Sequence, residues 1–312
     1  MARILVTGTA GFIGTALCPA LAAQGHSVVA ALRREAPAPP RGVETAIVGD
    51  ITATTDWRRV LRGVEIVIHL AQRAHAGPDA AALAGEPPGT VALTRALAEA
   101  GGRRLLLMSS VKAMGEATAP GRPFHVGDEP RPEDAYGQTK LASERAATEA
   151  ARDAGVELVI VRSPLVYGPG VKANLAALMR LIASGVPLPF AAVDNRRSLI
   201  GRDNLVELLV IAAAHPSAPG LTLLAHDDKD LSTPALICAL AGGMDRPARL
   251  FAVPNALFAA LRPLPGIGPR LARLTQSLQV DDGATRAVLG WAPRIPAKAA
   301  LAAMARAFAA GL

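Results

Sequence analysis

The sequence predicts an α/β fold built on a doubly wound parallel sheet, followed by a smaller mixed α/β domain. Two observations predict the sheet: short apolar runs alternate with helical patterns through the first half, and a glycine-rich turn follows the first run. A third predicts the second domain, because Pro and Gly become frequent after Pro164. Continuous apolar strands separated by helices are typical of a parallel sheet that helices cover on both faces.

Apolar runs in the first half are expected to form the strands of this sheet. They are Arg3–Thr7, Ser27–Leu32, Glu44–Val48, Ile66–Leu70, Arg104–Ser109 and Val156–Val161. The helices expected between them are Thr15–Gln24, Val91–Ala100 and Ala135–Ala154. Gly155 is expected to end the longest helix, because glycine readily adopts the left-handed conformation of a helix C-cap. In the second half, Thr233–Gly242 and Asn255–Leu261 are expected to be helical.

The first strand runs directly into the glycine pattern GxxGxxG of residues 7–14. Gly8 permits a tight turn off the strand, Gly11 lets backbone amides approach a pyrophosphate, and Gly14 lets the helix pack close to the sheet. The free N–H groups at the start of the helix would face the phosphates. At the first strand–helix junction of a parallel α/β pattern, this motif predicts a Rossmann-type dinucleotide-binding fold; a purely structural glycine turn is the alternative.

This fold suggests a division of the chain into two domains. Residues 1–168 are expected to form the dinucleotide-binding domain, and residues 196–215 to return to it. Residues 169–195 and 216–312 are expected to form the substrate-binding domain, packed on the carboxyl edge of the sheet. Ligands bind at that edge in open α/β folds.

The end of the second strand indicates which cofactor is used. NAD-binding folds often place an acidic residue there to hold the ribose hydroxyls. This chain has Arg33 and Arg34 instead, and two guanidinium groups are suited to a 2′-phosphate. The sequence therefore favours NADP(H) over NAD(H). The alternative is that both arginines are merely solvated at the start of a loop.

Composition narrows the class of protein further. Hydrophobic residues make up 51% and charged residues 19%, which excludes a disordered chain. The net charge is +7, but the basic residues are scattered and aromatics are only 3%, so an anionic small molecule is expected rather than nucleic acid. Cys18 and Cys238 have no metal-site spacing, and no metal is expected. No apolar run spans a membrane and no signal peptide is visible, which predicts a cytoplasmic protein.

The strongest catalytic signal is the pair Tyr136 and Lys140, four residues apart on one face of a predicted helix. An ammonium group next to a phenol favours the phenolate and lowers its pKa. Tyr136 is therefore expected to exchange a proton with a substrate oxygen. The strand that ends in Ser109 and Ser110 places a hydroxyl at the carboxyl edge of the sheet, where it would hold that oxygen.

These motifs together resemble the extended short-chain dehydrogenase/reductase superfamily, in its nucleotide-sugar epimerase/dehydratase/reductase branch. The matching segments span nearly the whole chain. They are TGTAGFIG (7–14), GDI (49–51), HLA (69–71), SSVKAMGE (109–116), YGQTK (136–140), RSPLVYGPG (162–170), NRRSLIGRDN (195–204) and LGWAPR (289–294).

The resemblance implies an NAD(P)-dependent oxidoreductase whose catalytic residues are Ser110, Tyr136 and Lys140. It implies that Asp50 and Ile51 lie near the adenine, and that Leu70 and Ala71 line the cofactor cleft. The residues expected to bind the cofactor are Gly8, Ala10, Gly11, Phe12, Ile13, Gly14, Arg33, Arg34, Asp50, Ile51, Leu70, Ala71, Gln72, Ser109, Tyr136, Lys140 and Pro164. His69 is expected to be packed in the core rather than catalytic.

Two departures from the branch concern the reaction. Met114 replaces a tyrosine that the epimerases usually carry, and Leu165 replaces an asparagine that commonly touches the nucleotide sugar. SSVKAMGE, RSPLVYGPGVKAN and RLTQSLQVDD (273–282) resemble bacterial 4-ketoreductases that make UDP-N-acetylquinovosamine for surface polysaccharides. The main prediction is therefore reduction of the C4 ketone of a 4-keto-6-deoxy nucleotide sugar. The alternatives are a nucleotide-sugar 4-epimerase or dehydratase, and a non-catalytic NADP-binding sensor.

A nucleotide diphosphate needs cations and backbone donors. The residues expected to bind the nucleotide-sugar substrate are Ser110, Lys112, Lys172, Asn174, Arg197 and Arg270. Arg197 is the best supported of them, because the resemblance places an arginine there on the diphosphate. The family also often forms dimers through two helices per subunit, which would include Ala135–Ala154, so a homodimer is expected.

Overall fold

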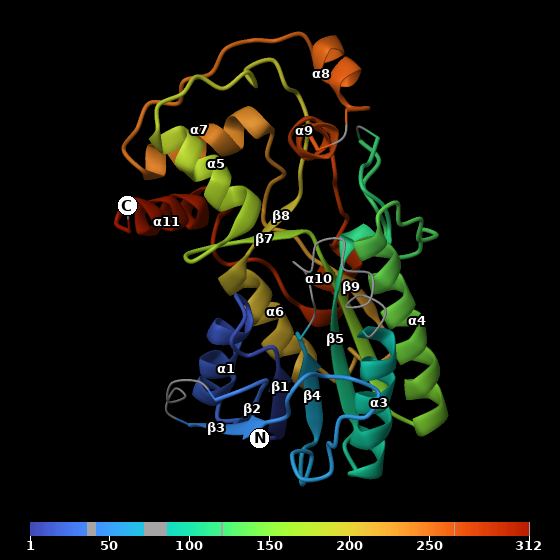
Figure 1. Cartoon of the computed structure of the whole chain (residues 1–312). Coiled ribbons are helices and arrows are strands. Elements are labelled where there is room, and N and C mark those ends of the chain that lie inside the picture. The colour runs from blue at the N-terminus through green and yellow to red at the C-terminus, as the bar shows by residue number, and fades with distance from the viewer. Residues whose placement is uncertain (36–41, 72–85, 120, 265, 312) are drawn as a thin grey trace.

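A computed structural model describes residues 1–35, 42–71, 86–119, 121–264 and 266–311. Its centre is a seven-stranded parallel sheet in the order β3-β2-β1-β4-β5-β6-β9 (Figure 1). The strands are β1 (Arg3–Thr7), β2 (Ser27–Leu32), β3 (Val43–Ile47), β4 (Ile66–His69), β5 (Arg104–Ser110), β6 (Glu157–Ser163) and β9 (Thr222–Leu224). The strand order reverses between β1 and β4, and a doubly wound sheet binds its ligand at such a point. The predicted fold class is confirmed.

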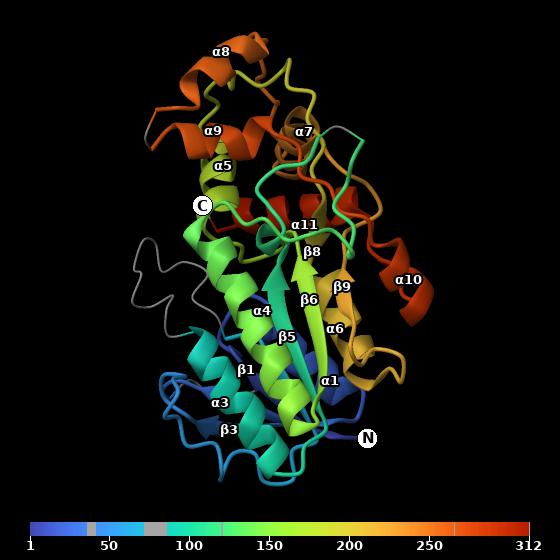
Figure 2. The same cartoon turned by 90° about the vertical axis from the view of Figure 1, so that its right-hand side faces the viewer.

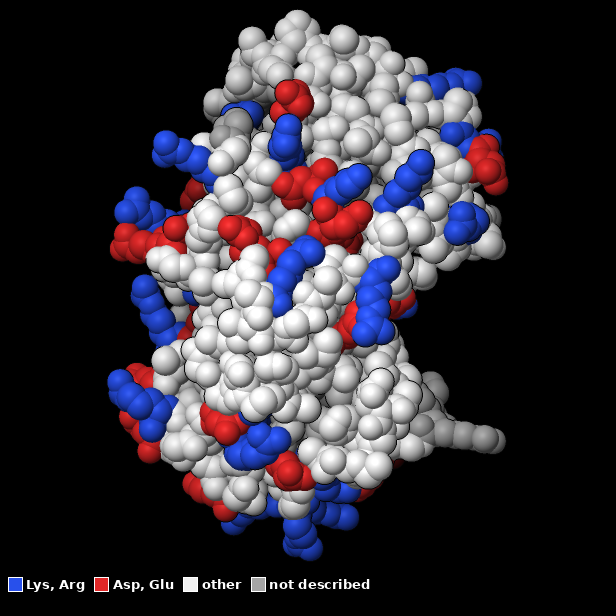
Figure 3. Space-filling model, turned by 180° about the vertical axis from the view of Figure 1, so that it is seen from behind, with Lys and Arg blue, Asp and Glu red and all other residues white. Residues whose placement is uncertain are grey.

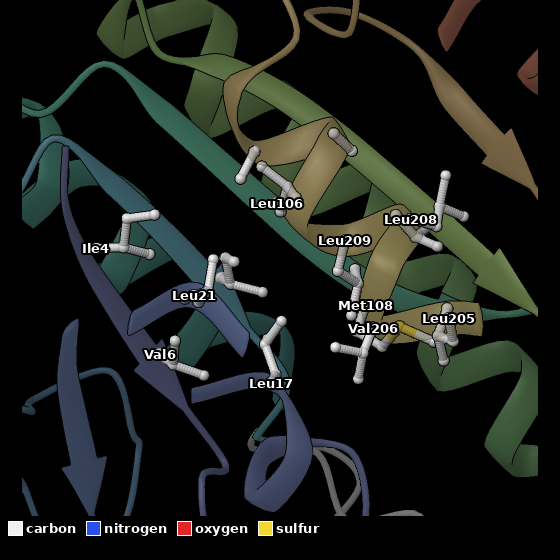
Figure 4. Packing of buried hydrophobic residues seen from close by; sticks show 14 of the residues in the cluster. Ile4, Val6, Leu17, Leu21, Leu106, Met108, Leu205, Val206, Leu208 and Leu209 are labelled. Atoms are coloured by element: carbon white, nitrogen blue, oxygen red, sulfur yellow. The ribbon is translucent and has the colours of Figure 1, made fainter. Parts of the chain in front are cut away.

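Helices cover both faces of the sheet. On one face lie α1 (Gly14–Ala23) and α6 (Arg202–Ala214), and on the other lie α3 (Glu86–Glu99) and α4 (Ala135–Ala154) (Figure 2). Figure 4 shows side chains of α1 (Leu17 and Leu21) and of α6 (Leu205, Leu208 and Leu209) in one apolar layer with side chains of β1 and β5. Full burial of each such side chain contributes about 1.5–3 kcal/mol. This packing fixes the carboxyl ends of the strands, where the site is built.

The rest of the chain forms a second core above that edge. Two short strands, β7 (Leu165–Tyr167) and β8 (Leu199–Gly201), pair in parallel. The helices of this half are α5 (Ala173–Ala183), α7 (Thr233–Gly243), α8 (Asn255–Leu261), α9 (Gly268–Thr275), α10 (Gly283–Leu289) and α11 (Ala297–Ala309). Strand β9 lies within the range expected for the substrate domain, yet it pairs with β6 in the main sheet. The domain boundaries themselves stay predictions.

Most predicted elements agree with the structure to within two residues, but one helix does not. The helix expected at Val91–Ala100 begins at Glu86. Pro87 and Pro88 occupy its first turn, where a helix needs no backbone N–H donor, so they start the helix rather than break it. This extension brings Glu86 into the site. Within the described ranges, no helix is long and apolar enough to cross a membrane.

Candidate active site

The glycine turn leaves no room for larger residues. A Cβ on Gly8 would lie 2.7 Å from the backbone nitrogen of Ala71, and Gly8 has a φ of +71°. A Cβ on Gly14 would lie 2.4 Å from the carbonyl oxygen of Gly8. Helix α1 starts at this turn, and in the described structure no side chain caps its N-terminus and no acid stands in its first turn. Uncapped N–H groups behind a close-packed glycine cradle fit the pyrophosphate of a dinucleotide.

The outer strands bring Arg33 and Asp50 together at the expected adenosine end of the site. Arg33 Nη1 lies 3.5 Å from Asp50 Oδ1, and both side chains are exposed. Strand β2 ends without an acid, but the loop after β3 supplies one beside it. Ile51 packs against the core on the α3 side of the sheet, and Arg34 is exposed. Gln72 lies outside the described residues.

Behind the turn, β4 contributes structural contacts. The Ala71 amide donates to Thr7 Oγ1 at 3.1 Å, and Thr7 Oγ1 lies 2.7 Å from His69 Nδ1. Burial lowers the pKa of His69 to about 3, with the charge of Lys140 adding to this effect. His69 is therefore neutral and packed, as expected. Leu70 is half-buried at the same edge, beside the glycine cradle.

The structure brings Ser110, Tyr136 and Lys140 together. Ser110 is the last residue of β5, and its hydroxyl is hydrogen-bonded to the half-buried Tyr136. Lys140 lies one helical turn further along α4, with its Nζ 5.2 Å from the centroid of the Tyr136 ring. Asp134 caps α4, because its Oδ1 accepts from the Gly137 amide at 2.7 Å. The buried Pro164 follows β6, whose last residue is in register with Ser110.

One electrostatic prediction is wrong for this structure. The Lys140 ammonium is expected to lower the pKa of Tyr136, but burial and the charge of Glu86 raise that pKa to about 12, against a smaller lowering by Ser110. Lys140 Nζ instead pairs with Glu86 Oε1 at 2.5 Å, so its charge is offset. Burial lowers the pKa of Lys140, and Glu86 acts in the opposite direction. Glu86 is not among the site residues predicted from the sequence, although an acid directly before two prolines is a signal for the start of a helix.

Ser109 differs from its neighbour. Its hydroxyl donates to Glu144 of α4, and Glu144 is held by the guanidinium group of Arg162 from β6. All three side chains are buried. The Ser109 hydroxyl is therefore committed to this cluster, which ties α4 to the sheet, rather than to the cofactor contact that was expected of it.

Lys112, which was expected to contact the substrate, forms two ion pairs within the protein. Its Nζ lies 2.7 Å from Glu116 Oε1 and 2.5 Å from Asp134 Oδ2. Burial raises the pKa of Glu116, while the hydrogen bond from Lys112 helps to keep that of Asp134 low against its own burial. Lys112 thus joins the loop after Ser110 to the start of the helix that carries Tyr136. It positions these two elements.

The remaining predicted substrate residues do not all gather at one place. Arg197 is half-buried and donates to the Gln276 carbonyl at 3.1 Å. Burial lowers the pKa of Arg197 to about 10. The charge of Glu116 raises this pKa, and the charge of Arg273 lowers it. Glu116 lies in the loop that follows Ser110, and Arg273 lies on α9, so charges from both segments act on Arg197. Lys172, Asn174 and Arg270 are exposed, the first two at the start of α5 and the third on α9.

Positive and negative side chains are interspersed on the face of the molecule drawn in Figure 3. Figure 3 shows Lys and Arg side chains among Asp and Glu side chains on one face of the molecule, without a continuous basic stripe. No cluster of three or more His, Cys, Asp or Glu side chains suited to a metal ion occurs among the described residues.

Comparisons with known proteins agree with this geometry. Residues 4–222 match the NAD dependent epimerase/dehydratase family. A UDP-glucose 4-epimerase of Vibrio cholerae is 39% identical over 93% of this chain and 90% of its own length. A dTDP-4-dehydrorhamnose reductase of Mycolicibacterium smegmatis is 32% identical over 59% of this chain and 51% of its own.

A solved structure shares the whole fold. The UDP-glucuronic acid 4-epimerase of Bacillus cereus, in complex with NAD, superposes with a TM-score of 0.80 at 21% identity and covers 98% of both chains. The protein is thus an oxidoreductase-type enzyme of the short-chain dehydrogenase/reductase class, which replaces the alternative of a non-catalytic sensor. The chain belongs to the NAD dependent epimerase/dehydratase family.

Proposed function

We propose that this enzyme inverts the configuration at C4 of a UDP-linked hexose. The observation that carries the proposal is the meeting of Ser110, Tyr136 and Lys140 at the carboxyl edge of the sheet that also holds the glycine cradle. Similarity to the Vibrio cholerae epimerase over almost the full length of both chains supports it. The epimerase alternative is thereby preferred over the ketone reduction that the sequence favoured.

The proton chemistry follows from these side chains. In its phenolate form, Tyr136 Oη accepts the proton of the C4 hydroxyl, and Ser110 holds that oxygen. A bound nicotinamide would supply the hydride acceptor and donor that the reaction at C4 needs. A C4 ketone has no configuration, so addition of hydride to its opposite face would invert the centre. Tyr136 then gives its proton back to the same oxygen, and nothing is consumed.

The diphosphate of the substrate is assigned to Arg197 and Arg273. Burial lowers the pKa of Arg197, the charge of Glu116 opposes this, and the charge of Arg273 lowers the pKa further. An anion bound between the two arginines would offset both of their charges. A guanidinium group binds phosphate oxygens through paired hydrogen bonds. This arrangement would direct the sugar toward Ser110 along the loop that contains Glu116.

A second candidate is reduction of a 4-keto nucleotide sugar, and one observation favours it. Tyr136 holds its proton firmly, with a pKa of about 12, as a proton donor to a ketone should at neutral pH. Two residues are consistent with this reaction: Met114 is buried and Leu165 is 44% exposed where the epimerases usually carry Tyr and Asn. Arg33 and Arg34, both exposed at the end of β2, would suit the NADPH that such a reductase consumes.

One pair of assays separates the two reactions. The enzyme is incubated with UDP-glucose or UDP-N-acetylglucosamine and NAD, and the C4 epimers are quantified by NMR. In parallel it is given UDP-4-keto-6-deoxy-N-acetylglucosamine with NADPH, and cofactor oxidation is followed. Epimer formation without net cofactor consumption supports the proposal. Stoichiometric NADPH oxidation with no epimer formed overturns it in favour of the reductase. Tyr136→Phe is the control and should abolish either reaction.

A further inference from the structure

Glu86 is an unexpected charge in the catalytic centre. Its side chain is 7% exposed and that of Lys140 is 1% exposed. Glu86 Oε1 accepts from Lys140 Nζ at 2.5 Å and from Ser143 Oγ at 3.2 Å. Its other oxygen, Oε2, is buried and has no hydrogen-bond partner within the described part of the chain. A buried carboxylate with one unsatisfied oxygen is costly, so its presence beside a catalytic lysine calls for a role.

The fold holds this carboxylate firmly in position. Glu86 is the first residue of α3, where the partial positive charge of a helix N-terminus favours an anion. Helices α3 and α4 pack side by side on the same face of the sheet (Figure 2). The pair Glu86–Lys140 therefore spans the two helices one turn beyond Tyr136.

We propose that Glu86 is a positioning residue of the catalytic centre: it holds the Lys140 ammonium in place beside the Tyr136 ring and offsets its charge. The inference rests on the proposed function only in assigning the proton transfer to Tyr136. Its physical content is a property of the protein itself and is measurable without substrate.

The electrostatics agree with the geometry. After burial, the charge of Glu86 is the largest contribution that raises the pKa of Tyr136. Asp134 also raises the pKa of Tyr136, and Ser110 lowers it. Glu144 on α4 raises the pKa of Lys140, Lys112 and Glu116 act on Asp134, and the charge of Lys140 acts on the neutral His69 of β4. Removal of the Glu86 charge takes away the ion-pair partner of the Lys140 ammonium, so Tyr136 should release its proton more easily.

The composition of the chain makes this titration simple to observe. The protein has only two tyrosines, Tyr136 and Tyr167. Tyr167 is fully buried and donates to Asp227 at 2.5 Å, and burial together with that carboxylate raises its pKa strongly. In protein labelled with ¹³C at tyrosine Cζ, two NMR signals are expected, and that of Tyr136 should move first as the pH is raised toward 12, because burial and Asp227 raise the pKa of Tyr167 further. Tyr136→Phe assigns the signals.

The test compares the Tyr136 titration in the wild type and in Glu86→Gln, which keeps the size and an acceptor oxygen but removes the charge. The midpoint should fall by about one pH unit or more. Ser143→Ala is the matched control, since it removes the other hydrogen bond of Glu86 and leaves the charge, and its midpoint should stay near that of the wild type. An unchanged or higher midpoint in Glu86→Gln overturns the proposal.

A second pair of variants covers the case in which Glu86→Gln does not fold because Lys140 is left buried and unpaired. Glu86→Gln/Lys140→Met contains no buried charge at this position and is compared with Lys140→Met. At one fixed alkaline pH, the double variant should contain the larger phenolate fraction of Tyr136, and equal fractions would refute the role of Glu86. A confirmed shift in a protein that neither epimerises nor reduces nucleotide sugars would sink the proposed function and leave the assignment of Glu86 intact.

Discussion

Glu144 and Arg162 form a buried two-point ion pair between helix α4 and strand β6. Arg162 Nη2 lies 2.6 Å from Glu144 Oε2, and Arg162 Nε lies 3.0 Å from Glu144 Oε1. The side chain of Arg162 is 8% exposed and that of Glu144 is 4% exposed. Because Glu144 lies two helical turns beyond Tyr136, this pair fixes the catalytic helix on the sheet.

Loss of one partner of this pair should therefore destabilise the protein. Arg162→Ala leaves the Glu144 carboxylate buried and unpaired, which costs about 3–5 kcal/mol. Chemical denaturation followed by circular dichroism measures the change. Arg152→Ala, which removes an exposed pair with Asp153, is the control and should change the free energy of unfolding by less than about 1 kcal/mol. Equal effects of the two variants would contradict the structural role of the buried pair.

Variants of the two arginines that follow β2 test whether the enzyme prefers NADPH to NADH. Arg33→Ala and Arg34→Ala should weaken NADPH binding by about tenfold or more and leave NADH binding nearly unchanged, because only NADPH carries the 2′-phosphate. Dissociation constants from fluorescence titration provide the measurement. If neither variant changes the ratio of the two affinities, the arginines are only solvated surface residues. Asp50→Asn examines the opposite possibility, in which the carboxylate beside Arg33 holds a ribose hydroxyl of NADH.

Arg197 provides a test of the substrate half. Arg197→Ala should raise the dissociation constant for UDP by about 10- to 100-fold, since a charge-assisted hydrogen bond to phosphate contributes about 1.5–3 kcal/mol. Cofactor affinity should stay constant. Arg270→Ala, on the exposed side of α9, is the matched control and should bind UDP nearly as the wild type does. Equal losses of UDP and cofactor affinity in Arg197→Ala would indicate a structural arginine instead.

His226 and Asp282 make part of the stability dependent on pH. Burial works against the charged His226, but Asp282 Oδ1, 3.3 Å from His226 Nε2, outweighs it and raises the pKa of His226. Asp282 is itself buried, yet His226 and Arg286 lower its pKa. A raised histidine pKa contributes stability that is complete below the unfolded value of about 6.5 and is lost as pH rises through the folded value.

The stability difference between the wild type and His226→Gln should therefore be largest at mildly acidic pH. It should shrink as pH rises above neutrality, and again as pH falls through the lowered pKa of Asp282. Melting temperatures measured across this range provide the test. A difference that grows from pH 6 to pH 9 would show that the charged histidine does not stabilise this fold.

Several features of the fold and site could be predicted from the sequence, because their signals are local. The apolar strands, the GxxGxxG turn and the pair Tyr136 and Lys140 each depend on residues close together in the chain. The sheet, the cradle at Gly8 and the position of Ser110 agree with those predictions. Glycine at a tight turn and a four-residue spacing on a helix act through backbone geometry, which nearby residues already determine.

Contacts between charges that are distant in sequence became visible only in the folded chain. Glu86 and Lys140 are 54 residues apart, and no periodicity links them. Their contact offsets the ammonium that the sequence assigned to Tyr136, and burial then decides the direction of the pKa shift. In the same way, Lys112 forms an ion pair with Asp134, and the Ser109 hydroxyl donates a hydrogen bond to Glu144. Local sequence patterns predicted the sheet, the glycine cradle and the grouping of Ser110, Tyr136 and Lys140. Desolvation and long-range pairing, which exist only once the chain is folded, determined what those side chains can do.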